Sequence, residues 1–147
     1  MTLEIRKIRQ DDKSDWRALY DGYLAFYEAD FSDESKELVW SRILDNQIQG
    51  RVAYIGDDMV GIAHFHIQTS TWADNGHVYL EDLFVAEDFR NKGVARTLIK
   101  EIESEARGEK CSEMYWITRG SNSRARALYD SLAAATDFVR YEIKLDL

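Results

Sequence analysis

Residues 78–106 read VYLEDLFVAEDFRNKGVARTLIKEIESEA, and this stretch decides the fold. Its first part, 78–85, is an almost continuous apolar run, which is typical of a strand covered on both faces. From Gly93 onward, apolar residues recur at helical spacing, namely Val94, Leu98, Ile102 and Ala106. The stretch therefore predicts a buried strand, a polar turn and a helix that packs one stripe on the sheet and ends near Gly108.

The rest of the chain predicts alternating strands and helices from its hydrophobic periodicity. Along the sequence we expect a strand at 3–8, helices over 16–27 and from Ser32 or Asp33 to about Asn46, a hairpin of 51–55 and 59–68, the strand 78–85 as the central strand, the helix after Gly93, a strand at 114–118, a helix over 125–132 and a last strand at 139–145. The predicted order is β-α-α-β-β-β-α-β-α-β. Because a strand-helix-strand crossover favours parallel pairing and the hairpin is antiparallel, we expect a mixed sheet in one α/β domain, 1–147.

Composition narrows the classes of function. The formal net charge of −8 disfavours a nucleic-acid partner and favours cationic ligands. No apolar run approaches the roughly 20 residues that span a bilayer, and residues 1–10 lack the apolar core of a secretory signal, so we expect no membrane role and a cytoplasmic location. The single cysteine, Cys111, excludes an internal disulfide and a Cys-based zinc cluster within one chain.

The turn at residues 87–96 joins the buried strand to the start of the amphipathic helix. Free N–H groups and the dipole at a helix start attract anions, and a glycine such as Gly93 lets the backbone approach a phosphate. The turn lacks the Gly-Lys-Ser/Thr ending of a Walker A loop and is not Gly-x-Gly-x-x-Gly. We therefore expect a phosphate-bearing cofactor other than the usual nucleotide or dinucleotide.

Arg90-x-x-Gly93-x-Ala95 resembles the Gln/Arg-x-x-Gly-x-Gly/Ala motif of the GNAT acetyltransferase superfamily, and flanking segments 80–85 and 122–129 resemble that family in order and spacing. The resemblance implies that acetyl-CoA is the co-substrate and that the turn cradles the CoA pyrophosphate, through Arg90, Asn91, Lys92, Gly93, Val94 and Ala95. It also implies that the strand 80–85 splays from 115–118 and pairs with the pantetheine arm. One backbone N–H at Leu83, Phe84 or Val85 is then expected to donate to the thioester carbonyl.

Two residues after the motif complete the expected cofactor site. Tyr129 resembles the tyrosine that often serves the family as general acid, and a phenol stays protonated at neutral pH and can donate to the leaving thiolate. Asn122 resembles the side chain that bonds pantetheine. Periodicity alone also fits Tyr129 as a core residue and Asn122 as a helix cap.

Glu81 is the predicted base that takes the proton of the attacking amine. We expect adjacent Glu81 and Asp82 to point to opposite faces of their strand, so that one of them faces the acceptor. Residues 79–82 resemble spermidine/spermine-type diamine acetyltransferases, which implies a small cationic amine as acceptor. The alternatives are a solvated or ion-paired Glu81, a protein lysine or N-terminal acetyltransferase, and a non-catalytic acyl-CoA-binding sensor.

Four further features complete the sequence-based hypotheses. His64-x-His66 places two imidazoles on one face of a strand, but without further ligands we expect no metal site. The acids near the junction of the first two helices could select a cation or serve as helix carboxylates, namely Asp30, Asp33, Glu34 and Glu37. The aromatic residues of 16–27 could line an acceptor pocket or pack as core or subunit interface, and exposure of some of them would favour a homodimer. Asp137 stands where the GNAT family usually has a glycine, and it tolerates the same left-handed turn better than most residues do.

Overall fold

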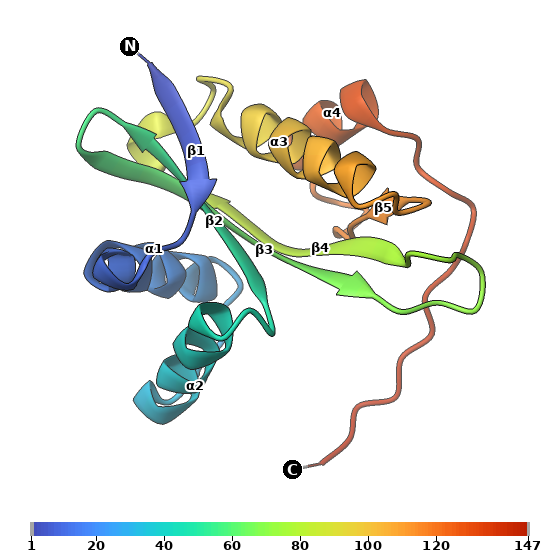
Figure 1. Cartoon of the computed structure of the whole chain (residues 1–147), viewed down its shortest axis with the longest axis horizontal. Helices are drawn as coiled ribbons and strands as arrows, with labels where there is room; N and C mark the ends of the chain where they lie inside the picture. Colours follow the sequence, from blue (N-terminus) through green and yellow to red (C-terminus); the bar gives the residue numbers. More distant parts are fainter. Residues whose placement is uncertain (1, 147) are drawn as a thin grey trace. The chain divides into compact units, whose positions relative to one another are not determined.

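The computed structural model describes residues 2–146, which form two compact units divided between Ile117 and Thr118. The first unit contains β1 (Leu3–Lys7), α1 (Lys13–Phe26), α2 (Asp33–Leu44), β2 (Gln49–Ile55), β3 (Asp58–Gln68), β4 (His77–Val85), α3 (Val94–Gly108) and β5 (Met114–Tyr115), as shown in Figure 1. The second unit contains α4 (Ser123–Leu132). The predicted α/β order is confirmed as far as α4. That 1–147 forms a single domain stays a prediction.

The five strands form one mixed sheet in the order β1-β2-β3-β4-β5. The first four strands pair antiparallel, and β4 pairs parallel with β5. The mixed sheet and the hairpin of β2 and β3 are thereby confirmed. The strand predicted to be central, β4, lies fourth, so β3 takes the middle place because the N-terminal strand extends the sheet on the far side of the hairpin.

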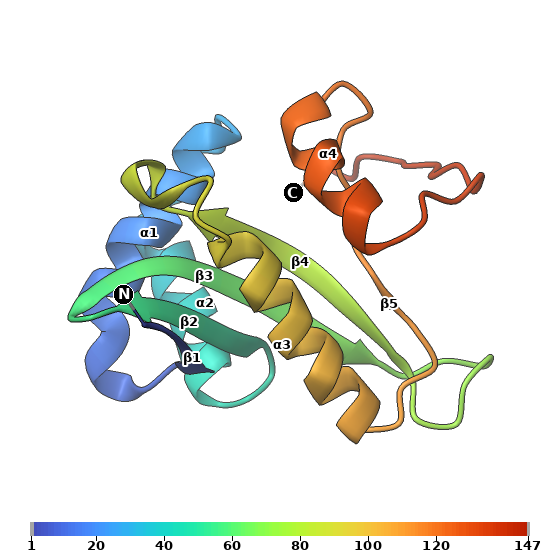
Figure 2. The ribbon, with the colours of Figure 1, turned by 90° about the horizontal axis from the view of Figure 1, so that it is seen from above.

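Helices cover both faces of the sheet. Figures 1 and 2 show α1 and α2 on one face and α3 on the other. Side chains of α1 such as Trp16 and Tyr20 pack into a buried cluster with Val52 and Ile62 of the sheet. Gly22 permits the close approach of α1 to β4, because a Cβ there would lie 3.0 Å from the Phe84 ring. Each face of the sheet is thus covered by at least one helix. The candidate site described below lies along β4, between these layers.

Two sequence-based expectations about the C-terminal part are wrong. The last predicted strand, 139–145, is extended but joins no ladder among the described residues, and β5 is limited to Met114–Tyr115 instead of 114–118. Alternating apolar residues give a segment the side-chain pattern of a strand, but a strand also needs a neighbouring backbone as hydrogen-bond partner.

Every helix within residues 2–146 is too short or too polar to span a bilayer.

Candidate active site

The turn after β4 has the backbone geometry of an anion site. Asn91 and Gly93 both adopt positive φ, 62° and 81°, and Gly93 is the residue that precedes the first turn of α3. No side chain caps this helix end, and a helix supplies no acceptor for its first N–H groups, here those of Val94 and Ala95. A Cβ built at Gly93 would meet no atom within 4 Å, so the backbone here is open to an incoming group.

Two cations flank this turn. The Nε of Arg90 donates to the carbonyl of Val85 at 3.1 Å and its guanidinium lies 5.6 Å from the Phe84 ring, which ties the turn to the end of β4. The Nζ of Lys92 lies 5.4 Å from the Phe89 ring. Positive φ, unpaired helix N–H groups and two cations are a donor set that fits a pyrophosphate, as in other phosphate-binding helix starts.

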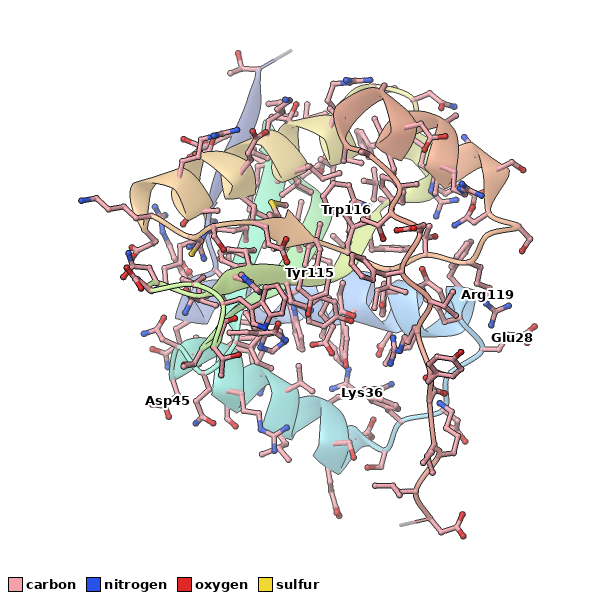
Figure 3. All side chains as sticks on the ribbon, turned by 90° about the vertical axis from the view of Figure 1, so that its right-hand side faces the viewer. Glu28, Lys36, Asp45, Tyr115, Trp116 and Arg119 are labelled. Atoms are coloured by element: carbon pink, nitrogen blue, oxygen red, sulfur yellow. The ribbon has the colours of Figure 1, made fainter. Side chains whose placement is uncertain are left out.

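β4 extends beyond its pairing with β5. The two strands pair only at Val78 with Met114 and at Tyr79 with Tyr115, so from Leu80 to Val85 β4 pairs with β3 alone among the described strands. Tyr115, labelled in Figure 3, marks the end of the paired region, where its ring stacks on Tyr79 with centroids 5.0 Å apart. The backbone of Leu83, Phe84 and Val85 therefore offers a free edge to an extended ligand chain.

A β-bulge in β4 places Glu81 and Asp82 on the same face of the sheet. Leu80 lies opposite Phe65 and Asp82 lies opposite His64, so Glu81 is an extra residue without a partner in β3. Asp82 bonds His64 at 2.8 Å and Glu81 bonds His66 at 2.7 Å, and these histidines share one face because they are two residues apart in a regular strand. The expectation that the two carboxylates face opposite ways is therefore wrong, because a bulge breaks the alternation.

The face that carries both carboxylates is the face covered by α1. Burial, followed by the negative charges of Asp82 and Glu81, raises the pKa of Tyr20 to about 12. Burial, the charge of Asp82 and a hydrogen bond to it also raise the pKa of Tyr23 far above its usual range. Both phenols stay protonated at neutral pH and can act only as hydrogen-bond donors toward the acids.

Sequence reasoning did not place His64 in this site and did not connect it with Trp16 and Asp82. Trp16 Nε1 donates to His64 Nε2 at 2.9 Å, and His64 in turn contacts Asp82. The alternation of His64 and His66 was visible, but the facing bulge was not, because nothing in residues 78–85 marks an extra residue. Among the described residues no cluster of three or more His, Cys, Asp and Glu side chains could hold a metal.

The acids at the start of α2 are already neutralised by cations of α1. Asp33 accepts from Arg17 at 2.7 Å, and Glu37 accepts from Lys13 at 2.7 Å. These pairs explain both carboxylates as links between the two helices. Glu81 and Asp82 differ from them, because each contacts a histidine and neither forms an ion pair with lysine or arginine among the described residues.

The two remaining predicted site residues lie in the second unit. Asn122 precedes α4 without capping it, and its Nδ2 donates to Thr118 Oγ1 at 3.3 Å, so its side chain stabilises the approach to the helix and not the helix end. Tyr129 is half-buried in the last part of α4, where its carbonyl accepts from Ala133 N at 2.9 Å. The functional roles of both residues stay predictions.

The mixed sheet, the free edge of β4 and the anion-binding turn before α3 define the class, an α/β domain that can hold a phosphate-bearing thioester cofactor along a strand edge. The model of the acetyltransferase (GNAT) family matches residues 16–133, and the chain belongs to that family. It is an acetyl-CoA-dependent N-acetyltransferase.

Relatives and solved structures agree with this assignment. The D-amino-acid N-acetyltransferase HPA3 of Saccharomyces cerevisiae is 31% identical over 144 residues, which cover 95% of this chain and 89% of that protein. The thialysine N-epsilon-acetyltransferase of Caenorhabditis elegans is 33% identical over 61% of this chain and 56% of its own length. The structure of AAC(6')-Iy with the bisubstrate analog CoA-S-monomethyl-acetylneamine shares the fold, with a TM-score of 0.85, 22% identity and coverage of 99% of this chain and 100% of that one.

Proposed function

We propose that this enzyme transfers the acetyl group of acetyl-CoA to a primary amine of a small cationic acceptor such as a diamine or polyamine. The observation that carries the proposal is the adjacent pair Glu81 and Asp82, two carboxylates on one face of the sheet without a lysine or arginine partner among the described residues. Two negative charges without a protein cation attract a cationic ligand. The relatives named for D-amino acids and thialysine also act on amines.

Each residue has a proposed role at a stated atom. Bound acetyl-CoA supplies an activated acetyl thioester. The N–H groups of Gly93, Val94 and Ala95 bind its pyrophosphate together with Arg90, Asn91 and Lys92, and Asn122 bonds its pantetheine arm. An N–H of β4 at Leu83, Phe84 or Val85 polarises the thioester carbonyl. Glu81 takes a proton from the acceptor ammonium, and the Tyr129 hydroxyl gives its proton to the departing thiolate.

The first experiment measures thiol release from acetyl-CoA against diamines, polyamines, D- and L-amino acids, thialysine, aminoglycosides and lysine peptides. We expect turnover with small cationic amines, and kcat reduced about a hundredfold in Tyr129→Phe and in Glu81→Gln, as for the loss of a general acid or base. Glu109→Gln is the matched control for Glu81→Gln, since it removes an exposed carboxylate at the end of α3.

The same panel contains the outcomes that contradict the proposal. Turnover of lysine peptides with no turnover of small amines would assign the enzyme to protein substrates. CoA binding without turnover of any amine would favour the acyl-CoA sensor. Equal kinetics of Glu81→Gln and Glu109→Gln would remove Glu81 as the base while leaving the acetyl transfer itself intact.

We also propose that the chain forms a homodimer. The observation behind this proposal is a set of apolar residues within 138–145 whose side chains are exposed in the single chain, namely Phe138, Val139, Tyr141, Ile143 and Leu145. Monomeric proteins rarely expose such a contiguous apolar series.

A further inference from the structure

A hydrogen-bond chain runs from α1 along the face of the sheet that this helix covers to the carboxylate of Asp82. The indole Nε1 of Trp16 donates to His64 Nε2 at 2.9 Å, and His64 Nδ1 lies 2.8 Å from Asp82 Oδ2. His64 is 1% exposed and Trp16 is equally buried, stacked on Tyr20 with ring centroids 4.8 Å apart. The geometry of the chain is therefore fixed by core packing and not by solvent-exposed side chains.

The direction of these hydrogen bonds settles the protonation state of His64. An indole nitrogen can only donate, so His64 Nε2 must accept and carries no proton. The imidazole proton must then lie on Nδ1, which donates to Asp82. In an imidazolium, the Nε2–H of His64 would point at the Nε1–H of Trp16, and neither group could accept. His64 is thus a neutral donor that orients Asp82 without neutralising its charge.

Among the described residues, the groups around Asp82 include hydrogen-bond donors but no lysine or arginine side chain paired with it. From α1, the phenols of Tyr23 and Tyr20 lie near enough to the acidic pair for its negative charge to raise the pKa of both. From the strands, the neighbouring groups are His64, His66 and the Glu81 carboxylate. The Asp82 side chain is 18% exposed, whereas that of Glu81 is 44% exposed. Asp82 is therefore the fixed member of the pair and Glu81 the more accessible member.

We propose that Trp16 and His64 are positioning residues that hold Asp82 as the anionic anchor for the acceptor's ammonium group. The inference rests on the proposed amine acetylation and divides the work of the two carboxylates: Asp82 binds charge and Glu81 exchanges the proton. Loss of the chain should therefore weaken acceptor binding much more than it slows the chemical step. KM for acetyl-CoA should not change, because the anion-binding turn lies elsewhere on β4 and α3.

A binding experiment with two substitutions at one position tests this division. The amide of His64→Asn can still donate to Asp82 from the place of Nδ1, whereas His64→Leu fills similar volume and cannot donate. With 1,5-diaminopentane as probe, we expect His64→Leu to weaken binding about tenfold or more, as for loss of a hydrogen bond to a charged group, and His64→Asn to recover most of that loss. His77→Asn, at the start of β4, is the matched control.

Nuclear magnetic resonance then tests the hydrogen-bond chain without any activity. The chain contains three histidines, so a long-range proton-nitrogen correlation spectrum can assign His64 by its absence in His64→Asn. We expect the Nδ1–H form near neutral pH. In Trp16→Phe, which keeps an aromatic ring in the stack, Nε2 is released from its donor and we expect a mixture of protonation forms together with weakened binding of 1,5-diaminopentane.

Three results overturn the inference: an Nε2–H form in the wild type, equal binding by His64→Asn and His64→Leu when both remain folded, or no binding of 1,5-diaminopentane by the wild type. The inference and the proposed function fail separately. If the wild type turns over amines but His64→Asn and His64→Leu bind 1,5-diaminopentane equally, the positioning role is wrong and the proposed acetyl transfer stands. If His64 has the expected protonation form and the variants bind 1,5-diaminopentane as expected, but no amine is turned over, Asp82 stands as the anchor and the proposed catalysis is wrong.

Discussion

Asp12 shows how a single buried carboxylate stabilises the first unit. It accepts hydrogen bonds from both terminal nitrogens of Arg6 at 2.7 and 2.8 Å, from the Arg9 N–H at 2.7 Å and from the Tyr54 hydroxyl at 2.9 Å. Burial alone favours the neutral acid, but these donors favour the anion more strongly and lower the pKa of Asp12 to about 2. The residue therefore links β1, β2 and the start of α1 through its negative charge.

This shift predicts a pH dependence of stability. Because the pKa of Asp12 in the folded state lies below its usual value of 3.8, the contribution is complete above about pH 4 and is lost as the pH falls toward 2. The shift corresponds to about 2 kcal/mol. Urea unfolding of wild type and Asp12→Asn should differ most at neutral pH and converge on acidification. A difference that stays constant below pH 4 would contradict this explanation.

Gly93 is the residue at which backbone conformation and cofactor binding coincide. An alanine there meets no neighbouring atom, so the cost of Gly93→Ala comes from its φ of 81° alone, about 1 kcal/mol or somewhat more. We expect a modest loss of stability and an increase in the dissociation constant of CoA by about tenfold, measured by calorimetry. Gly108→Ala at the other end of α3 is the control, because that position also has free space but no positive φ.

At the scale of elements, α3 depends on its contact with β3. A Cβ at Gly61 would lie 3.0 Å from Val94 Cγ1 and 3.2 Å from Leu98 Cδ1. In Gly61→Ala the side chains of Val94 and Leu98 must give way by a few tenths of an ångström, and we expect the start of α3 to be displaced with them. Overpacking of this kind costs about 1–3 kcal/mol. Because that displacement also moves the anion-binding turn, we expect both a lower melting temperature and weaker CoA binding. A variant with lower stability and wild-type CoA affinity would show that the packing of α3 on β3 does not control the anion-binding turn.

Local sequence signals predicted the elements whose stability is itself local. The helical spacing of Val94, Leu98 and Ile102 gave α3, and Ser32 caps α2 as one of the two expected residues, with its Oγ accepting from Ser35 N at 3.1 Å. The turn that contains Asn91 and Gly93 was likewise predicted from the local motif alone. These features depend on residues within one or two helical turns of each other, so one sequence contains the information.

The rest depends on partners that are distant in the sequence. The bulge at Glu81 exists because β3 offers one residue, His64, opposite Asp82, and that register is set by the whole β3–β4 pairing. Likewise, the indole N–H of Trp16 meets His64 only after α1 packs on the sheet. The acidic pair was thus partly predictable, since Glu81 was identified as a candidate, but its shared face and its buried support were not.

At the scale of the whole molecule, the C-terminal segment 138–145 is the part whose apolar side chains have no cover in the single chain. Arg140 and Lys144 pair with Glu142 at 3.3 and 3.0 Å on one side of the extended backbone. The apolar residues 139, 141, 143 and 145 alternate with these charged residues and are 74–93% exposed. Such an amphipathic strand gains stability from a sheet partner, and a symmetric dimer lets each copy give and receive the same segment.

We therefore expect the protein to be dimeric at micromolar concentration in light-scattering chromatography, and removal of 138–147 or the double substitution Tyr141→Glu with Ile143→Glu to shift it to monomer. Trp72→Ser is the control, because Trp72 is 90% exposed in the β3–β4 connection and is not part of the C-terminal segment. A truncated chain that stays dimeric would place the interface elsewhere. A wild-type monomer with a protected, folded segment would mean that the strand pairs within its own chain.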